Sequence, residues 1–193
     1  MNFKKLGFKI FLIIGFFIVI SIIVHINKTG NDEVFEDLYQ GLKKVEAKEK
    51  SFMKFTQYNK KAGDYLIKKL PEEKDDLIKT DVIQIIGFSG CTNCEERLIS
   101  LLNDSDWHVR FFVIDTLDKL NYKDMPILLP KVIINDTNEN VRIEAIITLG
   151  KYGNEKDISF LEGLVSQKDY KTKKLSKAID IALAKLKSKF SKN

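Results

Sequence analysis

Two cysteines three residues apart, in the segment Cys91-Thr92-Asn93-Cys94, are the only cysteines of the chain. A pair at this spacing can close a local disulfide, exchange disulfides with another protein, or supply two of the roughly four ligands that a zinc ion takes. Thr92 and Glu95 fit a capping box, so we expect a helix to begin here with Cys94 in its first turn. A thiol at that place ionises more readily and can act in exchange.

The sequence leaves three roles open for this pair. An inert disulfide or thiol pair is favoured, and the disulfide is the expected form if the body lies outside the cytoplasm. A redox-active pair is the alternative, although no βαβ pattern of the thioredoxin kind surrounds it. A metal site is disfavoured because the only histidines are His25, in the apolar N-terminal segment, and His108.

No other pattern in the sequence predicts catalysis. We find no set of nucleophile, base and orienting group, no glycine-rich phosphate loop and no HExxH motif. His108 precedes an apolar helical pattern and is expected on the surface rather than as a base. The sequence therefore predicts a protein that is not an enzyme and that needs no cofactor or metal.

A repeat predicts the elements that position these residues. Segments 104–117 and 136–149 carry matching residue types at an offset of 32. Such a period is typical of stacked helical repeats, and the apolar positions, four apart, line one helical face in each copy. We expect the carboxylates of Asp104 and Asp136 to accept hydrogen bonds from the first N–H groups of these helices. The matching positions are Asp104, Val109, Arg110, Val113 and Leu117 in the first copy, and Asp136, Val141, Arg142, Ala145 and Leu149 in the second.

These residues resemble the HEAT family in its short bacterial form, whose pattern is Asp-x-x-x-x-Val-Arg-x-x-Ala-x-x-x-Leu-Gly. The second copy, ending at Leu149 and Gly150, fits this pattern, whereas the first has Val113 in place of Ala and Asp118 in place of Gly. The resemblance implies one helix pair per repeat, with the Asp and Arg bonding between neighbouring turns. It therefore implies structural roles for Asp104, Arg110, Asp136 and Arg142.

The predicted fold class is all-α: a right-handed α-solenoid of about four HEAT-like helix pairs over residues 71–193, preceded by a single transmembrane helix. A solenoid needs at least about three such units. Residues 78–87 align loosely with 141–150 and are expected to form the second helix of a weaker repeat. The later pairs are expected at 91–103 with 106–120, 125–134 with 140–152, and 157–165 with 172–190.

Residues 34–70 are also expected to be helical, after a short linker at 28–33. This segment can be a stalk or coiled coil that joins the membrane to the repeats, or the first, degenerate helices of the solenoid. We favour the second interpretation because no strict heptad pattern is sustained.

The first 27 residues predict a membrane anchor. Lysines precede the uninterrupted apolar run 10–24, and a helix over 10–26 is about 26 Å long, near the hydrocarbon thickness of a bilayer. A cleaved signal peptide is the alternative, but residues 22–26 offer only Ile, Val and His where small residues are needed. The positive-inside rule places the N-terminus in the cytoplasm and the body outside the cell membrane.

The net charge of +5 is unevenly distributed along the chain. All acidic residues follow residue 31, whereas residues 168–193 hold nine lysines against two aspartates. The C-terminal helix can be a polar cap of the solenoid, which any terminal repeat requires. Alternatively, its lysines contact an anionic surface. We expect no nucleic-acid partner.

Positions off the apolar stripe are expected to form a surface for another protein. Phe112 is an aromatic residue at the position where the second copy has Glu144. Aromatic side chains beside carboxylates are plausible anchors for a partner, but packing between adjacent repeats explains them equally well. The partner-binding candidates are Trp107, His108, Phe112, Asp115, Asp118 and Glu144.

From the sequence we therefore predict a membrane-anchored scaffold or adaptor that binds a protein partner. A membrane-tethered thiol–disulfide protein using Cys91 and Cys94, and an anionic-surface binder using the C-terminal lysines, are the alternatives.

Overall fold

The computed structural model describes residues 31–191. These residues form ten α-helices and three short 3₁₀ helices, and they contain no strand. The all-α prediction is therefore confirmed for this part of the chain. The predicted anchor at 1–27 lies outside the described residues. Within residues 31–191, no helix is both long and apolar enough to cross a membrane.

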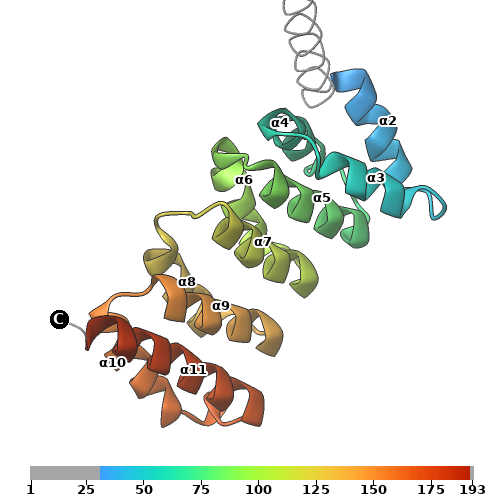
Figure 1. Ribbon diagram of the computed structural model, residues 1–193. Coiled ribbons are helices and arrows are strands. Elements are labelled where there is room, and N and C mark those ends of the chain that lie inside the picture. Colours follow the sequence, from blue (N-terminus) through green and yellow to red (C-terminus); the bar gives the residue numbers. More distant parts are fainter. Residues whose placement is uncertain (1–30, 192–193) are drawn as a thin grey trace, which may run out of the picture.

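The helices follow one another in pairs along an extended stack (Figure 1). Three 3₁₀ helices accompany them: η1 (Thr92–Cys94) and η2 (Leu101–Asn103) flank α6, and η3 (Lys168–Tyr170) precedes α11. The pairs are α2 (Asp32–Leu42) with α3 (Lys48–Phe55), α4 (Lys60–Lys69) with α5 (Asp76–Ser89), α6 (Glu95–Ser100) with α7 (Trp107–Lys119), α8 (Met125–Asn135) with α9 (Glu139–Tyr152), and α10 (Glu155–Val165) with α11 (Lys173–Phe190).

The second helices of successive pairs, α5, α7, α9 and α11, pack side by side in chain order (Figure 1). From α7 onward, the helix bounds agree with those expected from the sequence within two residues. The segment 91–103 differs, because it forms η1, α6 and η2 rather than one regular helix. The α-helix of this segment, α6, is therefore only six residues long.

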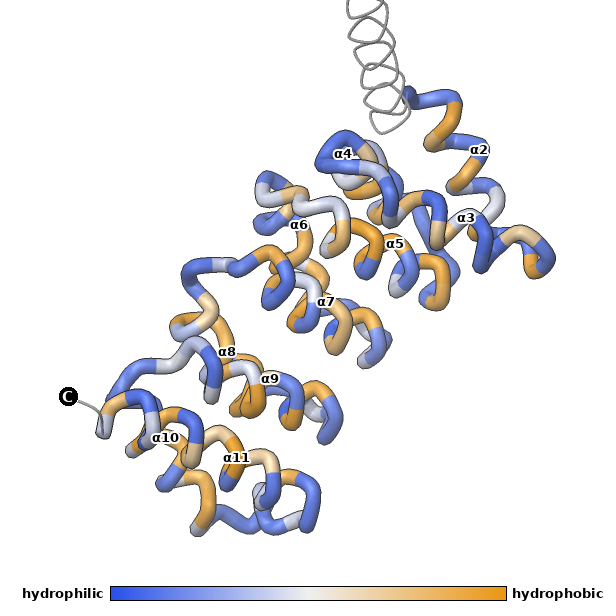
Figure 2. The backbone as a smooth tube through the Cα atoms, viewed as in Figure 1, coloured by the Kyte–Doolittle hydropathy of each residue, from blue (hydrophilic) through white to orange (hydrophobic). Residues whose placement is uncertain are grey.

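One apolar cluster runs through the whole stack. The stripe predicted from the repeat lies in it: Val109, Val113 and Leu117 on α7 are fully buried, as are their counterparts on α9. Figure 2 shows apolar residues recurring along the labelled helices between hydrophilic ones. Fully burying such a side chain contributes about 1.5–3 kcal/mol. Phe35 and Leu66, from α2 and α4, are buried in the same cluster, so the first helices share the core.

Side-chain hydroxyls fix the spacing of neighbouring helices. The Thr116 hydroxyl on α7 donates to the carbonyl of Ile83 on α5 at 3.0 Å. The Tyr152 hydroxyl on α9 donates to the carbonyl of Asp118 on α7 at 3.1 Å. Buried hydroxyls need such partners because an unpaired polar group is costly in the core.

The α9–α11 contact depends on a glycine instead. A Cβ at Gly150 would lie 2.7 Å from the backbone Cα of Ala182, so only glycine permits this approach. The Gly that ends the HEAT-like pattern therefore has a packing role here.

The prediction for the residues that cap α7 and α9 was wrong. Asp106 and Asn138, rather than Asp104 and Asp136, cap α7 and α9 with their side chains. Asp104 and Asp136 accept instead from the backbone N–H of the capping residues, at 2.9 and 2.8 Å. Each aspartate uses one oxygen for this bond, which leaves its second oxygen for contacts between helices.

Candidate binding surface

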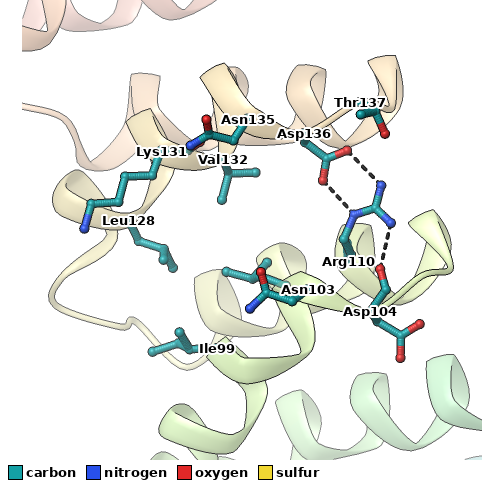
Figure 3. A pocket seen from close by; sticks show the side chains of 11 residues that line it. Ile99, Asn103, Asp104, Arg110, Leu128, Lys131, Val132, Asn135, Asp136 and Thr137 are labelled. Atoms are coloured by element: carbon teal, nitrogen blue, oxygen red, sulfur yellow. Dashed lines mark hydrogen bonds and ion pairs between the residues drawn. The ribbon is translucent and has the colours of Figure 1, made fainter.

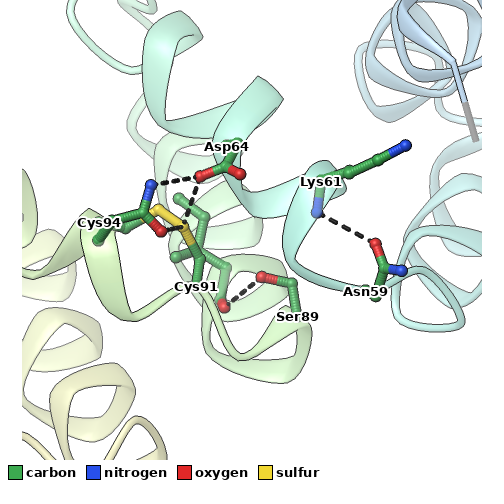
Figure 4. Close-up of a disulfide and its surroundings, with 8 residues drawn as sticks. Asn59, Lys61, Asp64, Ser89, Cys91 and Cys94 are labelled. Carbon is green, nitrogen blue, oxygen red and sulfur yellow. Dashed lines mark hydrogen bonds between the residues drawn. A yellow bond between two sulfur atoms is a disulfide. The ribbon is translucent and has the colours of Figure 1, made fainter. Parts of the chain in front are cut away.

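Cys91 and Cys94 form a buried disulfide at the start of α6, with their Cα atoms 5.5 Å apart. The predicted capping box is absent, because the side chain of Thr92 caps nothing and Cys94 ends η1. Asp64 of α4 holds the loop instead, since its Oδ1 accepts from the Asn93 amide at 2.6 Å and lies 3.4 Å from the Cys91 sulfur (Figure 4).

Gly63 permits this close approach of α4. A Cβ at this position would lie 2.4 Å from the Cβ of Cys91 and 2.3 Å from the Ser89 hydroxyl. Neither Gly63 nor Asp64 was found by sequence reasoning, because both contacts join segments far apart in the chain.

The surroundings of the disulfide oppose redox chemistry. Exchange requires a thiolate to reach a sulfur atom, and both cysteines are fully buried. A thiolate formed at Cys91 would also face the negative charge of Asp64. The Asp64 carboxylate and the two sulfurs lie within 4.8 Å of one another, but disulfide sulfurs are not the thiolates that bind a metal.

Arg110 and Asp136 form a bidentate ion pair between α7 and the residue that follows α8 (Figure 3). The Nε–Oδ2 and Nη2–Oδ1 distances are 2.7 and 2.8 Å. Nη1 of the same arginine donates to the carbonyls of Asp104 and Ser105. One step earlier, Lys79 of α5 pairs with Asp104 at 3.1 Å. Each carboxylate that precedes the second helix of a pair thus binds a cation on the second helix of the preceding pair.

Arg142, the equivalent of Arg110 in the second copy, has no such carboxylate. Within residues 31–191, no hydrogen-bond partner contacts its buried Nε atom. Its guanidinium lies 5.2 Å from the ring centroid of Tyr170. The implied structural ladder therefore changes at this residue from an ion pair to a cation–π contact.

A groove of about 410 Å³ adjoins the Arg110–Asp136 pair between η2 and α8 (Figure 3). Ile99, Leu102, Leu128 and Val132 supply its apolar surface. Polar side chains complete the lining: Asn103, Asp104, Lys131, Asn135 and Thr137.

A second candidate surface, which we name the α5–α9 face, joins three of the predicted partner-binding residues. Lys119 contacts Asp115 at 2.5 Å and lies 4.8 Å from the ring centroid of Phe88 on α5. Phe88 is 53% exposed and was not among the partner-binding residues predicted from the sequence. The face consists of Phe88, Asp115, Asp118, Lys119, Glu144 and Lys151.

Glu144 carries the unusual electrostatics of this face. Burial raises its pKa above the usual range, and the negative charges of Asp115 and Asp118 add to that effect. Thr148 donates a weak hydrogen bond to it at 3.4 Å. The charge of Lys119 offsets part of this rise in pKa. Lys119 pairs with Asp115 and Lys151 pairs with Asp118 at 2.6 Å, so within the described residues Glu144 itself has no ion-pair partner.

The other candidates lie elsewhere on α7. Trp107 and His108 stack on each other at the first turn, with ring centroids 3.7 Å apart. The His108 Nδ1 atom lies 3.1 Å from Asp106. Phe112 is partly buried and packs edge-on against Phe111. The structure therefore groups Asp115, Asp118 and Glu144, and separates Trp107 and His108 from them.

The C-terminal helix α11 buries its apolar stripe and exposes its lysines. Two of these lysines have partners within the chain. Lys187 pairs with Glu162 at 2.6 Å, and Lys189 donates to the carbonyl of Gly153 at 3.0 Å. Four others are exposed on the same helix: Lys173, Lys174, Lys177 and Lys185.

Comparisons with known proteins assign neither a family nor a function. No family model matches the chain, and no curated protein does. Among solved structures, the chain is similar to an engineered protein from the Northeast Structural Genomics Consortium, at 14% identity and a TM-score of 0.49. The match covers 86% of this chain and 87% of that one.

Proposed function

We propose that this chain is a membrane-anchored scaffold of HEAT-like helix pairs, a right-handed α-solenoid, that binds another protein through its α5–α9 face. The side-by-side packing of α5, α7, α9 and α11 supports this architecture. Stacked helices of this kind present a continuous surface, which solenoid proteins use for binding.

The desolvated Glu144 is the observation that carries the proposal. Its carboxylate lies half-buried near two further carboxylates, and within residues 31–191 it has no ion-pair partner. Charged groups in such a place are costly unless they are paired. A cationic side chain of a partner would supply the missing charge, and the exposed ring of Phe88 would contact apolar atoms beside it.

The anchor and the disulfide support one location for the scaffold. Residues 1–27 anchor the chain in the cell membrane with the N-terminus in the cytoplasm, and the body lies on the outer side. Stable disulfides such as Cys91–Cys94 form and persist in oxidising compartments.

The test is a crosslinking pull-down of the tagged, full-length chain from native membranes. A triple variant, Asp115→Gln, Asp118→Gln and Glu144→Gln, removes three negative charges from the face. A matched control removes three from exposed positions elsewhere, as Glu46→Gln, Glu96→Gln and Glu155→Gln. The proposal predicts a specific partner that is lost with the triple variant and retained with the control. Equal recovery by both variants would reject the face as the binding site.

A further inference from the structure

Two grooves lie at equivalent places in successive repeats, on the side of the stack formed by the first helices of the pairs. The first is the groove beside Arg110, and the second, of about 530 Å³, lies between α8, α10 and η3. Seven lining positions correspond at the offset of 32. The repeat therefore builds the same concave site twice. The corresponding residues are Leu102 and Ile134, Arg110 and Arg142, Leu128 and Phe160, Lys131 and Gly163, Val132 and Leu164, Asn135 and Gln167, and Thr137 and Asp169.

The grooves differ in what binds the arginine. In the first, Asp136 pairs with both Nε and Nη2 of Arg110. In the second, the position equivalent to Asp136 is Lys168, which is exposed and has no carboxylate to offer. The Nε atom of Arg142 is buried there without a hydrogen-bond partner among residues 31–191.

Tyr170 keeps the guanidinium of Arg142 in place without satisfying its donors. The ring lies 5.2 Å from the guanidinium carbon, and the Tyr170 hydroxyl already donates to the carbonyl of Ile133 at 2.7 Å. A ring supports the face of a guanidinium, whereas the N–H groups point along its edge. No side chain within the described part of the chain therefore takes, on Arg142, the place that Asp136 has on Arg110.

We propose that the second groove binds a carboxylate of a peptide segment, with Arg142 in the role that Arg110 has toward Asp136. A bidentate carboxylate matches the geometry of guanidinium donors, and it would remove the cost of the unpaired Nε. Ile134, which is 60% exposed, and Phe160 flank the site with apolar surface. The ligand is thus a carboxylate next to an apolar side chain, as in the chain's own segment 133–138. This site is distinct from the α5–α9 face and does not depend on it.

The charges around the groove favour such a ligand. Arg142 and Lys168 are cationic, and Asp169 is the one carboxylate among the lining residues. Asp169 is exposed and forms no ion pair with Arg142. It is the competitor that the test must exclude.

Arginine side-chain NMR tests the proposal in the full-length, detergent-solubilised chain. Arg97, Arg110 and Arg142 are its only arginines, so three Nε–H signals report on three environments. The probe is the acetylated, amidated peptide Ile-Ile-Asn-Asp-Thr-Asn, and the control peptide has Asn in place of Asp. A third peptide, acetyl-Ile-Ile-Asn-Ala with a free carboxyl terminus, distinguishes a terminal carboxylate from a side-chain carboxylate.

The expected result is a saturable shift of the Arg142 signal with a carboxylate peptide and no shift of the other two signals. Arg142→Gln should weaken peptide binding by about tenfold or more, as expected for losing a charge-assisted pair, while the Arg97 and Arg110 signals confirm folding. The triple variant of the α5–α9 face should bind the peptide unchanged, which separates this proposal from the proposed function.

Three outcomes would overturn the proposal. One is an equal response to the Asn peptide, and another is an equal shift of the Arg97 signal. The third is a shift of the Arg142 signal in the Asp169→Asn variant without peptide that is equal in size and opposite in direction to the shift that peptide causes. In that case the chain's own carboxylate fills the site.

Discussion

Arg110 on α7 binds both carboxylate oxygens of Asp136, and both side chains are largely buried, with 11% and 6% of their surface exposed. Arg142 occupies the same repeat position, and among residues 31–191 no carboxylate pairs with it. Two arginines that look equivalent in sequence therefore have different energetic roles.

Replacing the two arginines by alanine should consequently have unequal effects. Arg110→Ala leaves Asp136 buried without its cation, and should lower the free energy of unfolding by about 1–3 kcal/mol. Arg142→Ala removes a donor that is itself unpaired, and should cost less than about 1 kcal/mol. Urea denaturation followed by circular dichroism measures both values.

Asp136 supplies the control for this comparison. In the double variant Arg110→Ala, Asp136→Ala, the loss should be smaller than the sum of the single losses, because no charge remains unpaired. Equal losses from Arg110→Ala and Arg142→Ala would contradict the different roles assigned to them.

The ionised carboxylate of Glu144 should lower the free energy of unfolding at neutral pH. Its pKa in the folded protein is raised by burial and by the nearby carboxylates. The folded state therefore holds a proton more tightly than the unfolded state, and ionisation above that raised pKa destabilises the fold. We expect Glu144→Gln to raise the melting temperature at pH 7, with a gain that disappears as the pH falls below the unfolded value near 4.5.

Glu155→Gln, at an exposed position, is the control for this titration. A Glu144→Gln variant that melts below the unmodified protein at pH 7 would show that the carboxylate stabilises the fold, contrary to this account.

The contribution of Glu73 to folding stability should show the opposite pH dependence. Burial alone would raise its pKa, but hydrogen bonds from Lys43, Tyr39 and the backbone N–H of Asp75 lower it to about 2. Its contribution to stability is therefore complete above the unfolded value of 4.5 and is lost as the pH falls toward 2.

Glu73→Gln should lower the free energy of unfolding at pH 7 by about 1–3 kcal/mol, because one amide oxygen cannot replace two charged acceptors. The difference from the unmodified protein should narrow as the pH is lowered toward 2 in thermal melts. Glu72→Gln, an exposed neighbour, should change little. A pH-independent loss would rule out the charge as the cause.

The predicted topology gives a separate test. If residues 1–27 anchor the chain with its body outside, a protease added to intact cells or spheroplasts should digest the body. Protection of the body until the membrane is broken would reverse the orientation. A chain without residues 1–30 should be recovered in the soluble fraction.

Much of the fold could be predicted from the repeat, because the spacing of its apolar residues is a local property of the sequence. Val109, Val113 and Leu117 recur at helical spacing, and this spacing alone indicates a buried face. The capping residues were predicted two positions early, at Asp104 and Asp136, because the repeat pattern does not show which polar residue before each helix accepts from its first N–H groups. The contacts of Gly63 and Asp64 with the disulfide were not predictable, since they depend on how α4 docks.

The difference between Arg110 and Arg142 could have been predicted from one further residue of the sequence. Extending the offset of 32 from Asp136 leads to Lys168, so the sequence already lacks a carboxylate there. Only the structure shows that Tyr170 supports the guanidinium instead, because cation–π contacts have no fixed spacing.

Site-specific photo-crosslinking in native membranes tests the central claim most directly. An aromatic photo-crosslinker replaces Phe88 on the α5–α9 face, and in a matched variant it replaces Ile127 on α8, which is 64% exposed. The account predicts a discrete adduct with one protein from position 88, no such adduct from position 127, and loss of the adduct in the triple Gln variant. The same adduct from both positions, or none from position 88, would contradict it.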